Sequence, residues 1–160
     1  MDTSKFNLWR ACFSFCFVDG FLIPEEQEWI ESKLSTLPFS AEQRQTLMKD
    51  LKSPPDIINL LPLITKPADR GFLVNQIRFL AELDFDLPDT EKAKIDEVHQ
   101  AVMSRIDLNA LSEVIAKDER ESYHEDEVYK LDKKHFFTER MFNGLLRILN
   151  PGDYKFPDEK

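Results

Sequence analysis

Apolar residues recur at the spacing of an α-helix along most of the chain, with short polar breaks between the runs. The clearest runs cover residues 6–18, 24–37, 41–52, 69–83, 89–104 and 137–149. The first run is apolar on nearly every side, which is typical of a central, buried helix. The later runs carry one apolar stripe. We therefore predict an all-α chain that folds as a compact bundle of about seven or eight helices.

The breaks contain residues that start and stop helices. Ser40-Ala41-Glu42-Gln43 has the form of a capping box, in which the side chains of Ser40 and Gln43 bond to each other's backbone N–H groups. Asp56 is placed to cap a short helix that continues to Leu61, and Pro62 ends or kinks that helix. These signals predict the positions of the helices as well as their existence.

Composition agrees with a helical fold and narrows the choice of partners. The chain has 160 residues and only 4 glycines, which fits a single helical domain because strand and loop architectures use more turn glycines. Its formal net charge of −9 argues against a phosphate-binding surface, since nucleic-acid affinity rests on clustered Lys and Arg. We expect no nucleic-acid partner.

The early apolar stretch also helps to predict the cellular compartment of the protein. Residues 11–18, bounded by Arg10 and Asp19, are fewer than the roughly 20 that a membrane-spanning helix needs. With no transmembrane segment and no signal peptide visible, we expect a cytoplasmic protein. Cys12 and Cys16 stand one helical turn apart, a spacing that does not favour a mutual disulfide, and we interpret them as reduced core residues.

The first helical hairpin has a counterpart 65 positions further along the chain. The matched pairs are Leu8 and Leu73, Cys12 and Ile77, Phe15 and Leu80, Asp19 and Asp84, Glu26 and Glu91, and Ile30 and Ile95. Each copy has a buried helix, an Asp at its end, a Pro in the turn and a Glu in the first turn of the next helix. The match predicts two pseudo-repeated helical hairpins.

At these turns the chain resembles the TerB-like family, which includes the tellurite-resistance protein TerB and the amino-terminal domain of membrane-anchored DnaJ-type co-chaperones. The first copy, Val18-Asp19-Gly20 followed by Pro24-Glu25-Glu26, matches the family motif closely. The second, Leu83-Asp84-Phe85-Asp86 followed by Pro88 and Glu91, matches it loosely because Phe85 replaces the Gly. The resemblance covers residues 6–106. It implies a TerB-like helical core over residues 1–106 and leaves a carboxy-terminal helical extension over residues 107–160.

The resemblance also implies a function. It points to a non-enzymatic bacterial stress-response or scaffolding module, in which the motif acids bind a divalent cation. On this chain those acids are Asp19, Glu26, Asp84, Asp86 and Glu91. Carboxylate oxygens suit Ca²⁺ or Mg²⁺, and the absence of His and Cys among them argues against Zn²⁺. The alternative is a metal-free protein interaction domain in which the same acids cap helices and complement helix dipoles.

The sequence carries no motif of a known catalytic site. We find no Ser-His-Asp order, Gly-rich phosphate loop or dinucleotide fingerprint, so we predict that the chain is not an enzyme. The pairs Asp96–His99 and Glu121–His124 have the spacing of di-iron ligands, but such a site needs glutamates from two further core helices. We interpret both histidines as surface residues.

The last third of the chain has a different character. Residues 107–116 predict a short helix, residues 117–134 are dense in mixed charge, and residues 137–149 predict an amphipathic helix. That last helix either packs on the first hundred residues or binds a partner. The partner we expect is another protein, including one in a membrane-associated complex, bound through this helix or through an acidic face.

Overall fold

The computed structural model describes residues 1–15, 24–82, 89–107, 109 and 141–146. This described part is helical with short connections and contains no strand, which confirms the all-α prediction. The elements are α1 (Thr3–Phe15), α2 (Pro24–Thr36), α3 (Ala41–Asp50), α4 (Ile57–Leu60), the 3₁₀ helix η1 (Leu61–Leu63), α5 (Pro67–Glu82) and α6 (Asp89–Arg105). Residues 141–146 are also helical.

The predicted caps are present. Ser40 Oγ accepts the backbone N–H of Gln43 at 3.2 Å, and Gln43 Oε1 accepts the backbone N–H of Ser40 at 3.1 Å. These two bonds form the capping box that starts α3. Asp56 caps α4 by accepting the N–H of Ile58 at 2.9 Å. At Pro62 the chain has passed from α4 into η1, as expected for a residue without a backbone N–H.

Two helices begin earlier than predicted. α1 starts at Thr3 instead of residue 6, because Asp2 acts as its cap and accepts the N–H of Lys5 at 3.1 Å. α5 starts at Pro67 instead of residue 69, because proline suits the first helical position. Most of the predicted helix at 107–116, the charged stretch 117–134 and most of 137–149 lie outside the described residues.

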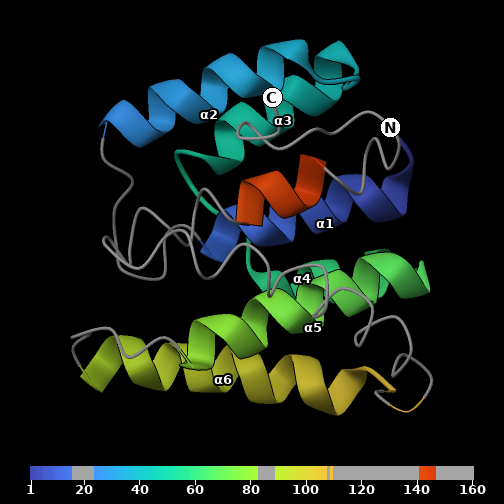
Figure 1. Cartoon of the computed structure of the whole chain (residues 1–160), viewed down its shortest axis with the longest axis vertical. Helices are drawn as coiled ribbons and strands as arrows, with labels where there is room; N and C mark the ends of the chain where they lie inside the picture. Colours follow the sequence, from blue (N-terminus) through green and yellow to red (C-terminus); the bar gives the residue numbers. More distant parts are fainter. Residues whose placement is uncertain (16–23, 83–88, 108, 110–140, 147–160) are drawn as a thin grey trace, which may run out of the picture.

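Helix α1 lies at the centre of the arrangement, as its apolar sequence predicts. In Figure 1 α2 and α3 lie on one side of it, and α4, α5 and α6 on the other. Its side chains form the middle of the hydrophobic core: Leu8, Trp9, Ala11, Cys12 and Phe13 are all 0% exposed. The prediction that Cys12 is a core residue is confirmed, whereas Cys16 lies outside the described residues.

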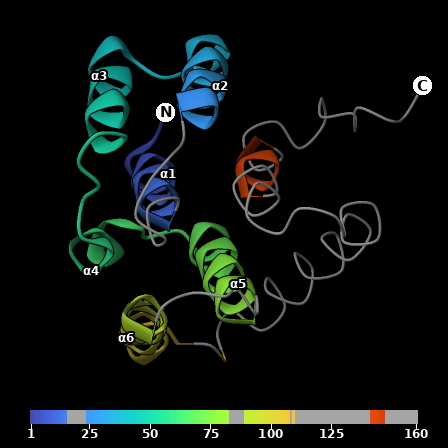
Figure 2. The same ribbon diagram turned by 90° about the vertical axis from the view of Figure 1, so that its left-hand side faces the viewer.

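Helices α1 and α5 lie beside each other and run in the same direction (Figures 1 and 2). Helices α2 and α6 run in the opposite direction, so the chain leaves α1 and α5, and enters α2 and α6, on the same side of the molecule, the left-hand side in Figure 1. A hydrogen bond of 2.6 Å between Ser4, near the start of α1, and Asp69, near the start of α5, agrees with this parallel arrangement.

The helical segment 141–146 packs on the core. Its side chains Met141, Phe142 and Leu145 are at most 1% exposed. The ring of Phe142 lies 5.1 Å from that of Trp9 in α1 and 4.9 Å from that of Trp29 in α2. The sequence left open whether the last helix packs on the first hundred residues or binds a partner. Residues 141–146 pack on the core, which is the first of these alternatives.

The amino-terminal cap gives a prediction about pH. The backbone N–H of Lys5 and, to a smaller extent, the ammonium group of Lys66 at 3.0 Å lower the pKa of Asp2 below its ordinary value of 3.8. A carboxylate with a lowered folded-state pKa stabilises the fold above its unfolded pKa, and this contribution is lost as pH falls through the folded pKa.

Asn caps a helix as well as Asp does, so Asp2→Asn isolates the charge. We expect Asp2→Asn to reduce the free energy of unfolding at pH 7 by about 0.5 kcal/mol, because the ion pair is exposed. The difference should shrink as pH falls below the ordinary pKa of 3.8 and disappear once pH is below the lowered folded-state pKa of Asp2. A difference that does not change with pH would assign the effect to the cap geometry alone.

Candidate functional site

The predicted cation ligands lie around the corners that join α1 to α2 and α5 to α6. Asp19, Asp84 and Asp86 are outside the described residues. Glu26 and Glu91 fall in the first turns of α2 and α6, and the positions of their side chains are not described. A site built from these five acids therefore stays a prediction. Within the described ranges no group of three or more His, Cys, Asp or Glu side chains is placed to hold a metal ion.

What the backbone does establish is the setting of these corners. The starts of α2 and α6 lie on the left-hand side of Figure 1, where α1 and α5 also end, with α2 at the top of the molecule and α6 at the bottom. Glu26 and Glu91 thus belong to the positive, N-terminal ends of their helices, where a carboxylate is favoured. An acid at the negative, C-terminal end of α1 or α5 would instead need a positive group or a capping role.

A buried polar cluster that was not among the sequence predictions links the starts of α1 and α5. Ser4 Oγ donates a hydrogen bond to Asp69 Oδ2 at 2.6 Å and accepts the backbone N–H groups of Thr65 and Lys66, each at 3.0 Å. One donor and two acceptor positions are the full capacity of a hydroxyl group. Ser4 is therefore saturated by bonds that join two helices, an arrangement that serves structure.

Asp69 is the most buried acid of the described residues. Asp69 is only 1% exposed. The second oxygen of its carboxylate, Oδ1, has no hydrogen-bond partner among the described residues. A buried carboxylate is costly unless it is bonded. The single bond from Ser4 is consequently important for this part of the fold.

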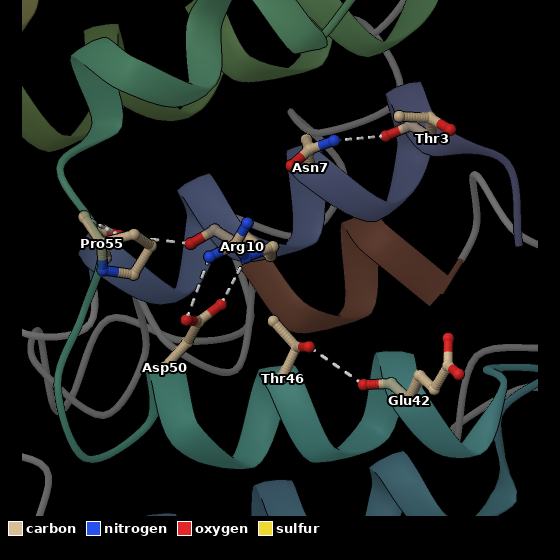
Figure 3. A network of polar contacts seen from close by, with 8 residues as sticks. Thr3, Asn7, Arg10, Glu42, Thr46, Asp50 and Pro55 are labelled. Atoms are coloured by element: carbon tan, nitrogen blue, oxygen red, sulfur yellow. Dashed lines mark hydrogen bonds and ion pairs between the residues drawn. The ribbon is translucent and has the colours of Figure 1, made fainter.

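A second polar pair joins α1 to α3 (Figure 3). Arg10 Nε lies 2.7 Å from Asp50 Oδ2, and its Nη2 lies 3.3 Å from Oδ1, so the guanidinium contacts both carboxylate oxygens. The Asp50 side chain is only 6% exposed, and that of Arg10 is 22% exposed. Arg10 is the one charged residue between positions 6 and 18, and this isolated charge in an apolar helix was the signal of a buried partner.

An aromatic cluster lies where α1, α2 and the segment 141–146 meet. Trp9 makes edge-to-face contacts with Phe13 at 6.0 Å, Phe39 at 5.3 Å and Phe142 at 5.1 Å between ring centroids. Phe142 in turn contacts Trp29 at 4.9 Å. We call Trp9, Trp29 and Phe39 the aromatic surface. Both tryptophans of the chain touch Phe142, so the docking of this segment is directly visible to tryptophan fluorescence.

Of the two carboxylate–histidine pairs with di-iron spacing, Asp96 and His99 fall in the described residues and do not have the placement of metal ligands in a bundle core. Asp96 is exposed on α6 while His99 is half-buried. A di-iron site would place both side chains in the bundle core. The other pair, Glu121 and His124, lies outside the described residues.

No protein-family model, curated protein or solved structure matches this chain. The likeness to the TerB-like family therefore rests on the two turn motifs. Among the helices that the structure describes, none has the length and apolar character that crossing a membrane requires.

Proposed function

We propose that this chain is a non-enzymatic, TerB-like helical module of a bacterial stress response or scaffold, with a Ca²⁺ or Mg²⁺ site at its paired acidic corners. The observation that supports the proposal is the parallel course of α1 and α5, with α2 and α6 returning from the same end (Figures 1 and 2). The ends of α1 and α5 and the starts of α2 and α6 lie on the same side of the molecule (Figure 1), and a shared site requires this. The proposal takes the cytoplasm as the compartment.

The chemistry of the corners agrees with a hard cation. In the sequence Asp19 follows α1 and Asp84 follows α5, and the end of a helix that the chain leaves is the negative end of its dipole, which repels carboxylates. A divalent cation offsets that repulsion and takes carboxylate oxygens as ligands. Asp86, Glu26 and Glu91 supply further oxygens from the same two corners.

Calorimetric titration with Ca²⁺ and Mg²⁺ tests the site. We expect the wild-type chain to give heat and a higher melting temperature, equivalent to about 2.7 kcal/mol when the free ion is 100 times its Kd. Asp19→Ala and Asp84→Ala should each remove the response, because each deletes a ligand. Asp96→Ala is the matched control, since Asp96 is an exposed acid on α6 and should leave the titration unchanged. Absence of heat and of a melting shift at millimolar ion would rule out the cation site.

The second candidate is a metal-free protein interaction module in which the same acids cap helices. The described aspartates favour it, because Asp2 caps α1 and Asp56 caps α4 through backbone N–H groups. Without added ion, Asp19→Ala would then lower the free energy of unfolding by about 1 kcal/mol, and Asp19→Asn would be neutral. A partner would meet an acidic face, because the apolar side chains of residues 141, 142 and 145 are already buried.

A further inference from the structure

We draw no further inference here: the strongest candidate, the buried carboxylate of Asp69 between the starts of α1 and α5, belongs to the polar cluster already described, and nothing in the described part of the chain shows what its second oxygen would bind.

Discussion

Alanine at Ser4 is expected to lower the free energy of unfolding by about 3 kcal/mol, because it removes the bond to a buried carboxylate. Asp69 is 1% exposed, and its other oxygen has no partner among the described residues. The substitution also removes the acceptor of the N–H groups of Thr65 and Lys66 at the start of α5. Urea denaturation at pH 7, followed by circular dichroism, measures the loss.

Ser14→Ala is the matched control for this prediction. Ser14 lies on the same helix, and its hydroxyl donates to the backbone carbonyl of Pro55 at 2.8 Å. Its removal leaves no buried charge, so we expect a loss of about 1 kcal/mol. The double variant Ser4→Ala/Asp69→Ala should lose less than the sum of the two single losses, because no carboxylate is left without its partner. A Ser4→Ala loss no larger than that of Ser14→Ala would show that Asp69 finds other partners.

The sequence predicted the positions of helices wherever the start signal is local. Ser40 and Gln43 are three residues apart, and Asp56 caps the N–H of a residue two positions on, so both caps can be recognised without knowing the fold. The start of α1 was misplaced for a related reason. The apolar pattern alone begins at Phe6, whereas the cap that starts the helix, Asp2, lies outside that pattern.

The polar clusters are harder to predict than the caps, because their partners are distant in sequence. Ser4 and Asp69 are 65 residues apart, and Arg10 and Asp50 are 40 apart. Such pairs form only when packing brings their helices together. The first separation equals the spacing of the proposed repeat, as expected for two parallel helices that lie in register. The same spacing, extended one turn before Leu8, pairs Ser4 with Asp69 and is the sequence signal of this contact.

The acidic corners show a different limit of prediction from sequence, which concerns the roles of residues and not their positions. The motif that singles out Asp19 and Asp84 consists largely of residues that punctuate helices, and capping and cation binding use the same carboxylate oxygens. Sequence alone therefore leaves both roles open. The direction of α1 and α5 adds information that the motif lacks, since both helices end on the side of the molecule where α2 and α6 begin (Figure 1).

Replacing Arg10 with alanine is expected to lower the free energy of unfolding by about 3 kcal/mol, because it leaves the carboxylate of Asp50 buried without its ion-pair partner. The Asp50 side chain is 6% exposed, and the contact involves both of its oxygens (Figure 3). Arg10 also lies over the ring of Phe6 at 5.9 Å, so packing is lost together with the charge. Thermal and urea denaturation of the variant measure the effect.

Two further variants distinguish the contribution of the Arg10–Asp50 ion pair from the contributions of its single side chains. Lys49→Ala removes an exposed positive charge from the last turn of α3, next to Asp50, and should change stability by less than about 0.5 kcal/mol. Arg10→Met/Asp50→Leu replaces both charges with apolar groups and should recover most of the Arg10→Ala loss, because no buried charge is left alone. If the double variant is as unstable as Arg10→Ala, the guanidinium acts through its contact with Phe6, and the ion pair itself adds little to the fold.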